Sequence, residues 1–113
     1  MANEVLTKAF LAGAAISARR IVKFDTTDGT VIQAAAAADL SVGVCGEVGP
    51  ASGERCDVIL QGIAEVDFGG TVTRGAMVTA DANGKAVAAA STNRTIGIAL
   101  VSAVSGDIAP VLI

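Results

Sequence analysis

Short runs rich in Val and Ile recur along the whole chain, and residues that favour turns separate them. Branched side chains favour extended backbone, because they pack well on a pleated surface. The links carry Gly, Asp, Asn and Ser, as in Asp28-Gly29 and Asn83-Gly84, which are typical of turns. We therefore predict a mainly β protein, a small single-domain β-barrel or sandwich of short strands. The predicted strands are residues 20–24, 30–33, 41–48, 55–60, 63–67, 76–80, 85–88, 95–101 and 108–113.

Two segments do not fit this pattern. Residues 34–38 are consecutive alanines, which favour a helix by propensity. Because the run is short and lies between two predicted strands, we expect a loop or a single turn there. Residues 4–18 place Leu6, Phe10 and Leu11 at near-helical spacing. Propensity leaves two alternatives open for this segment, a short helix or an extended arm.

The two halves of the chain resemble each other. Matching segments follow in the same order, and their spacing falls from 56 to 53 residues, as short loop deletions would cause. We therefore predict a possible internal duplication, with Gly43 and Gly97 in equivalent places, where a glycine within a strand marks a bulge or a close backbone approach. The matching segments are 21–22 with 77–78, 28–29 with 83–84, 42–44 with 96–98, 52–53 with 105–106, and 58–60 with 111–113.

Charge is unevenly distributed along the chain. Residues 1–23 carry four basic residues against Glu4, a charge of +3, whereas residues 24–113 carry −6. The overall charge of −3 and the pI of about 4.7 argue against nucleic-acid binding, which needs a basic surface. A basic segment on an acidic body suggests an arm that meets an acidic surface, and a chance cluster of solvated residues is the alternative. We divide the chain into an N-terminal arm, residues 1–19, and a β-rich domain, residues 20–113.

The chemistry available for catalysis is sparse. The chain has no His, the most common general base and metal ligand. Glu65 and Asp67 share one face of a predicted strand, as paired catalytic carboxylates would, but a solvated strand face is the favoured interpretation among eleven carboxylates. We expect no enzyme and no catalytic, cofactor or metal site. The longest uncharged stretch, residues 95–106, is too short to span a membrane.

The two cysteines, Cys45 and Cys56, are too few for a disulfide scaffold. They flank a turn and could face each other across a hairpin, although two small buried thiols are the favoured interpretation. The apolar run near the N-terminus is weak and Ala-rich for a secretory signal. We therefore expect a protein made and kept in a cytosol, with both thiols reduced.

Seven segments follow one another in a recognisable order: residues 8–24, 28–29, 41–44, 56–60, 62–66, 75–84 and 95–98. This order, which covers nearly the whole chain and ends in an apolar strand, resembles that of the tailed-phage capsid cement, or head decoration, proteins. No single motif carries the resemblance. The order of the first segments is also similar, more loosely, to that of lambda-type decoration proteins.

The resemblance implies a structural virion protein without catalytic residues. Such a protein would bind the outer surface of an assembled icosahedral phage head and stabilise it by bridging copies of the major capsid protein, commonly as a homotrimer. Assembly would take place in the cytoplasm of the host bacterium. Apolar residues beside basic ones make the N-terminal segment the expected capsid interface, with Leu6, Lys8, Phe10, Leu11, Arg19 and Arg20 as candidates.

The alternative function is a small β-barrel module of a cellular assembly that binds a partner or a carbohydrate. The absence of Trp and Tyr counts against carbohydrate binding, because binding sites for such ligands rely on aromatic side chains.

Overall fold

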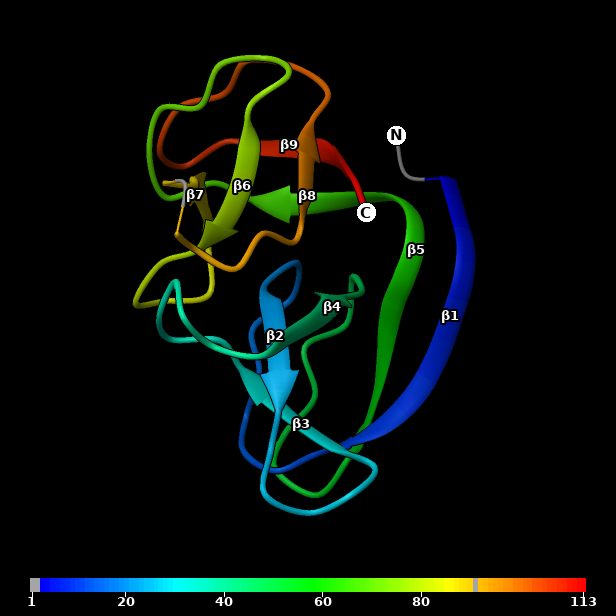
Figure 1. Cartoon of the computed structure of the whole chain (residues 1–113). Helices are drawn as coiled ribbons and strands as arrows, with labels where there is room; N and C mark the ends of the chain where they lie inside the picture. Colours follow the sequence, from blue (N-terminus) through cyan, green and yellow to red (C-terminus); the bar gives the residue numbers. More distant parts are fainter. Residues whose placement is uncertain (1–2, 91) are drawn as a thin grey trace.

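The structure is a computed structural model that describes residues 3–90 and 92–113. Within these ranges the chain forms nine strands in one hydrogen-bonded sheet (Figure 1). The described residues include no helix that is long and apolar enough to cross a membrane. The strands are β1 (Asn3–Ala12), β2 (Ile21–Phe24), β3 (Thr30–Gln33), β4 (Ser41–Cys45), β5 (Arg55–Asp67), β6 (Met77–Ala80), β7 (Ala86–Ala88), β8 (Gly97–Ala99) and β9 (Ile108–Leu112).

The first half of the chain closes a ring of five strands. β3, β2, β4 and the first half of β5 pair in that order, each antiparallel to the next. β1 pairs antiparallel with β5 along most of its length and parallel with β3 at its end, where Ala12 lies opposite Val31. β1 therefore completes the ring.

The second half of the chain closes a second ring. β7, β6, β8 and β9 pair in the same antiparallel order, and β9 pairs with the second half of β5. A parallel bridge between Phe68 and Ala86 closes this ring. β5 serves both rings and bends between its halves (Figure 1). Gly62, with a φ of 111°, lies between the two halves, in backbone that favours glycine.

The two rings share one register. Leu11 on β1 lies opposite Arg55 on β5. Asp67, 56 residues after Leu11, lies opposite Ile108, 53 residues after Arg55. These are the spacings of the sequence matches, so the predicted internal duplication is confirmed. We refer to residues 3–60 as repeat 1 and to residues 61–113 as repeat 2.

Glycines occupy equivalent positions where neighbouring backbones come close. A Cβ atom on Gly43 would overlap the carbonyl oxygen of Ile59, and a Cβ atom on Gly97 would overlap that of Leu112. Only glycine lets β4 and β8 approach their neighbours so closely. The predicted equivalence of these two glycines therefore has a steric cause.

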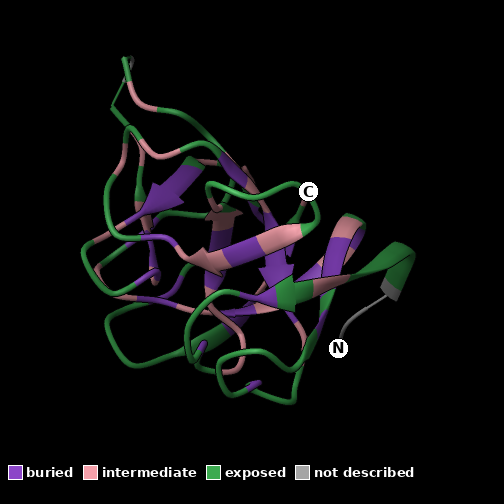
Figure 2. Ribbon diagram, turned by 90° about the horizontal axis from the view of Figure 1, so that it is seen from below, coloured by how far each residue is buried: buried purple, intermediate pink, exposed green. Residues whose placement is uncertain are grey.

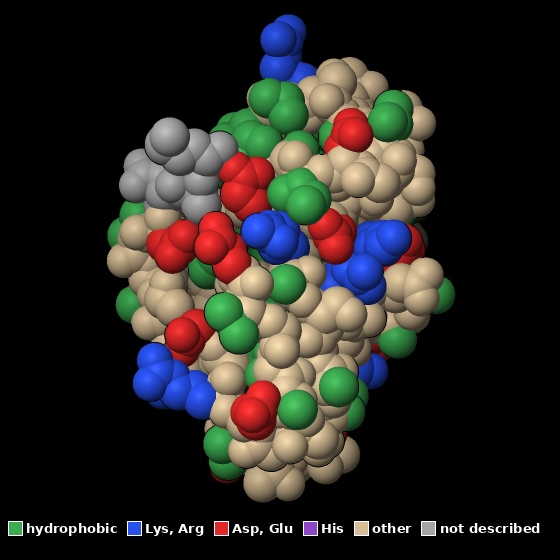
Figure 3. Space-filling view, turned by 180° about the vertical axis from the view of Figure 1, so that it is seen from behind, with side chains coloured by type: hydrophobic (Ala, Val, Ile, Leu, Met, Phe, Trp, Pro, Cys, Tyr) green, Lys and Arg blue, Asp and Glu red, His purple; other side chains and the backbone are tan. Residues whose placement is uncertain are grey.

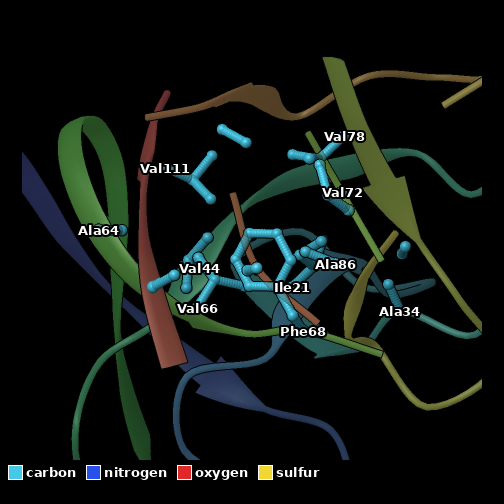
Figure 4. Packing of buried hydrophobic residues seen from close by; sticks show 14 of the residues in the cluster. Ile21, Ala34, Val44, Ala64, Val66, Phe68, Val72, Val78, Ala86 and Val111 are labelled. Atoms are coloured by element: carbon cyan, nitrogen blue, oxygen red, sulfur yellow. The ribbon is translucent and has the colours of Figure 1, made fainter. Parts of the chain in front are cut away.

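Each repeat encloses buried side chains of its own. The cluster inside repeat 1 includes Val22 and Val58, and the cluster of repeat 2 surrounds Phe68 (Figure 4). Most buried residues lie on the strands, while much of the loop surface is exposed (Figure 2). The buried core residues outside the strands are Ile16, Ala34, Phe68, Val72 and Ala103. The cluster of repeat 2 also contains Ile21 and Val44 of repeat 1, so it extends across the junction between the repeats.

The predicted mainly β, single-domain fold is confirmed. Residues 34–38 contain a turn and no strand, as expected. Residues 4–18 are extended over most of their length rather than helical, because β1 pairs with β5. The predicted break between residues 55–60 and 63–67 is wrong, since β5 continues through Gly62. Residues 1 and 2 of the predicted arm lie outside the described residues.

Candidate functional site

β1 carries four of the six residues predicted for the interface. Leu6 and Leu11 keep 50% and 53% of their surface exposed. The register of β1 against β5 shifts on both sides of Leu6, and such bulges redirect side chains. Adjacent strand residues point to opposite faces, so Phe10 and Leu11 do not form one stripe. The candidates are brought onto one strand but not onto one face.

Phe10 and Lys8 lie on the face of β1 that borders the interior of repeat 1. Phe10 lies opposite the buried Cys56 and is partly buried against the cluster inside repeat 1. The Lys8 ammonium lies 5.5 Å from the centroid of the Phe10 ring. This cation–π contact places an exposed positive charge over an aromatic surface.

Arg19 and Arg20 are neighbours with different surroundings. Arg20 Nε donates a hydrogen bond to Asp67 Oδ2 at 3.0 Å, and its Nη1 donates to the Asn83 carbonyl oxygen at 2.9 Å. Arg20 therefore joins repeat 1 to repeat 2. Arg19 has a φ of 61°, which is uncommon for a residue with a side chain. Its side chain faces a hollow at the surface.

Lys23, another basic residue of the N-terminal segment, also pairs within the molecule. Its Nζ lies 3.4 Å from Asp39 Oδ2, which also accepts hydrogen bonds from the backbone N–H groups of Ala35 and Ala36. The Ala35 hydrogen bond, followed by Lys23, holds the pKa of Asp39 below its ordinary value of 3.8. Acidic and basic side chains are interleaved across one face of the molecule (Figure 3). Carboxylates of the body thus hold two of the four basic residues, Arg20 and Lys23.

The hollow beside Arg19 has a volume of about 310 Å³. Four carboxylates and the Arg19 guanidinium line it. Glu65 lines the hollow, whereas Asp67 pairs with Arg20. The two carboxylates that the sequence places on one strand face therefore have different surroundings. Within residues 3–90 and 92–113, no group of three or more His, Cys, Asp or Glu is arranged to hold a metal ion. The lining residues are Glu4, Thr7, Arg19, Gly46, Glu47, Val48, Asp57, Ile59 and Glu65.

Cys45 and Cys56 face each other inside repeat 1. Their Sγ atoms lie 3.8 Å apart, and both are buried free thiols. The hydrogen bond with Cys56, together with burial, raises the pKa of the Cys45 thiol. Both interpretations of the pair therefore hold, since the thiols meet across neighbouring strands and are buried. Their reduced state in solution stays a prediction.

Repeat 2 carries an exposed apolar row that is not among the residues predicted from the sequence. Met77 on β6 lies opposite Ile98 on β8, which lies opposite Leu112 on β9, and all three are exposed. Leu112 follows the alternating pattern of β9, next to the buried Val111. Met77 and Ile98 are each followed by a buried residue, Val78 and Ala99. This alternation is the sequence signal for an outward-facing row, and the duplication marks the equivalent positions in repeat 1.

Comparison with known proteins places this chain in a family. Residues 2–112 match the family model described as phage cement protein. Because this match spans nearly the whole chain, the protein belongs to the phage cement protein family and is a capsid-associated structural component of a phage particle. The resemblance drawn from the order of motifs is thereby confirmed.

The fold also occurs among solved structures of other proteins. The N base of head fiber gp8.5 of bacteriophage phi29 superposes with a TM-score of 0.72 and 18% sequence identity. The superposition covers 96% of this chain and 92% of that chain. At this identity the likeness establishes the fold. No curated protein sequence matches this chain.

Proposed function

We propose that this protein binds the outer surface of an assembled icosahedral phage head and stabilises the head by bridging copies of the major capsid protein. In this proposal it acts as a homotrimer on the capsid exterior and is added in the cytoplasm of the host bacterium. The observation that carries the proposal is the family match over residues 2–112.

Mass action gives the physical reason for such a role. A protein that binds only the assembled head lowers the free energy of that state relative to dissociated subunits. The two rings share β5 and are joined by the Arg20–Asp67 ion pair, so they form one body suited to span a junction between subunits. Binding of this kind needs surface area and complementarity, and it needs no reactive group.

The exposed apolar residues of β1 are the proposed anchors. Fully burying a Leu side chain contributes about 1.5–3 kcal/mol, and Leu6 and Leu11 have about half of their surface left to bury. The exposed Lys8 contributes less to affinity, because ion pairs at a wet interface are weak and are screened by salt. Lys8 and Arg19 are instead proposed to affect the orientation and rate of binding.

The test is co-sedimentation of the purified protein with phage heads assembled without it. Saturable binding, with an increase in the temperature at which the heads open, supports the proposal. A folded protein that fails to sediment with these heads overturns it.

Point variants locate the contact. Leu6→Asp and Leu11→Asp are expected to weaken attachment tenfold or more, equivalent to about 1.4 kcal/mol. Lys8→Ala and Arg19→Ala should weaken it less and reduce its dependence on salt. Val104→Asp, at an exposed position outside β1, is the matched control. Wild-type affinity in both leucine variants would show that β1 does not make the contact.

Deletion of residues 2–10 separates the two descriptions of the N-terminal segment. A folded truncation that attaches weakly is expected if the segment is a separate arm. Loss of the circular dichroism spectrum of the folded protein is expected if the segment belongs to the body. The pairing of β1 with β5 and the packing of Phe10 favour the second outcome, so the point variants are the cleaner probes of binding.

A further inference from the structure

The outer face of repeat 1 is buried inside the molecule. Ile21, Val44 and Ile59 lie opposite one another on β2, β4 and β5. Their exposed fractions are 0%, 0% and 5%. They belong to the same buried cluster as Val66 and Phe68 of repeat 2 (Figure 4). Repeat 2 therefore covers the outer row of repeat 1.

The equivalent row of repeat 2 lies at the surface. Met77, Ile98 and Leu112 occupy the positions of Ile21, Val44 and Ile59, with the same cross-strand pairing. Their exposed fractions are 45%, 36% and 43%. Directly opposed side chains on neighbouring strands are close enough to touch. Met77, Ile98 and Leu112 therefore form one continuous apolar row. No other part of the described chain buries this row as repeat 2 buries the row of repeat 1.

The duplication also indicates what fits this row. Repeat 2 covers the row of repeat 1 with a cluster that includes Ala64 and Val66 of β5. The residues 56 positions earlier are Lys8 and Phe10 of β1. Phe10 is partly buried and carries the Lys8 ammonium over its ring. Phe10 is thus the repeat 1 equivalent of Val66. In a second copy, Phe10 would present an aromatic surface to the exposed row, as Val66 presents an aliphatic one to the buried row.

We propose that the row of Met77, Ile98 and Leu112 is a self-association surface, and that repeat 1 of a second copy occupies it through the face of β1 that carries Lys8 and Phe10. The contact is heterologous, because the row of one copy meets β1 of the next. Heterologous contacts generate a closed ring when the rotation between copies closes. The inference deepens the proposed capsid-bound trimer and rests on it for its biological setting, but its test needs no capsid.

Sedimentation velocity of the free protein over a range of concentrations tests the proposal. Wild type and the control Val104→Asp are expected to associate with increasing concentration. Ile98→Asp is expected to raise the dissociation constant tenfold or more. Met77→Glu, at the exposed first residue of β6, serves as a second variant if Ile98→Asp fails to fold by circular dichroism.

Mixing two variants tests the heterologous geometry. A row variant keeps its β1 face, and a Lys8→Glu or Phe10→Glu variant keeps its row. A mixture of the two is expected to form a heterodimer and nothing larger, because only one complementary pair of surfaces remains. A row variant that associates like wild type, or a mixture that forms no heterodimer, overturns the proposal.

A wild-type protein that stays monomeric at the highest soluble concentration also overturns the proposal. If a row variant associates like wild type but no longer binds heads, the row is a capsid contact instead. Failure of the proposed capsid function gives a different result. In that case the wild-type protein does not sediment with heads, whatever its self-association in solution.

Discussion

The two repeats use the same strand order and register but fill their interiors differently. Repeat 2 places the large Phe68 where repeat 1 has Ala12. At four equivalent positions around this one, repeat 2 has the smaller side chain of the pair. The side chains of both repeats are buried at these positions. The equivalent pairs, repeat 1 first, are Ile16 and Val72, Val31 and Ala86, Cys45 and Ala99, and Cys56 and Ala109.

This difference teaches that total core volume matters more here than the volume at any one position. Cores tolerate compensating changes of size as long as the space is filled. The strand pairings and the glycines at positions 43 and 97 stay constant between the repeats. The backbone is therefore shared, while side-chain size varies at the positions around Phe68.

The largest effect is expected from breaking the compensation in repeat 2. Phe68→Ala should lower the free energy of unfolding by about 3–5 kcal/mol, because its small neighbours cannot fill the cavity. Urea denaturation measures the change. Phe24→Ala, at an exposed phenylalanine of repeat 1, is the matched control and should cost far less. Equal losses in the two variants would mean that Phe68 does not fill the core of repeat 2.

The glycines test whether the two backbones are equivalent. Gly43→Ala and Gly97→Ala should each lower the free energy of unfolding by about 1–3 kcal/mol, because the new methyl group meets a neighbouring carbonyl oxygen. Gly46→Ala is the control, since its Cβ would lie 3.6 Å from the Asp57 oxygen, an ordinary contact. A large loss at one glycine and none at the other would contradict the equivalence.

The junction between the repeats should contribute less than either core. Asp67→Asn removes the charge that Arg20 contacts across the junction and should cost about 1 kcal/mol, since the partly exposed pair is screened. Asp57→Asn breaks the more exposed pair with Arg55 and should have little effect. Thermal unfolding of both variants makes the comparison, and a larger loss from Asp57→Asn would count against a stabilising junction.

The smallest expected effect is a pH dependence confined to repeat 1. Because the pKa of Asp39 is lowered in the folded protein, its stabilising contribution is present above pH 3.8 and is lost as the pH falls through the lower folded value. Asp39→Asn should therefore make the loss of stability on acidification shallower. Unfolding curves measured between neutral and strongly acidic pH show this difference, and superimposable pH profiles would refute it.

The sequence predicted most strands because their signals are local. Val and Ile runs favour extended backbone wherever they occur, and the duplication could be read from spacing alone. The conformation of residues 3–12 could not be predicted, because it depends on pairing with β5, more than 40 residues away. The continuity of β5 through Gly62 could not be predicted either, because it depends on the strands that pair with each half of β5.

The candidate interface was predictable only in part. Sequence position identified Leu6 and Leu11 as apolar residues near basic ones, and both are exposed. It could not show that Arg20 pairs with Asp67, 47 residues away. Nor could composition distinguish the buried row of repeat 1 from the exposed row of repeat 2, because both rows consist of apolar residues and differ in whether another part of the molecule covers them.

The most direct test of the shared backbone is amide hydrogen exchange measured residue by residue. The Gly13 amide donates to the Val31 carbonyl, and the equivalent Gly69 amide donates to that of Ala86. The amides of Ile16 and Val72 form a second equivalent pair, donating to Pro50 and Ala103. If the two repeats share one backbone, all four amides are protected from exchange. Protection in one repeat with free exchange at the equivalent positions of the other would contradict it.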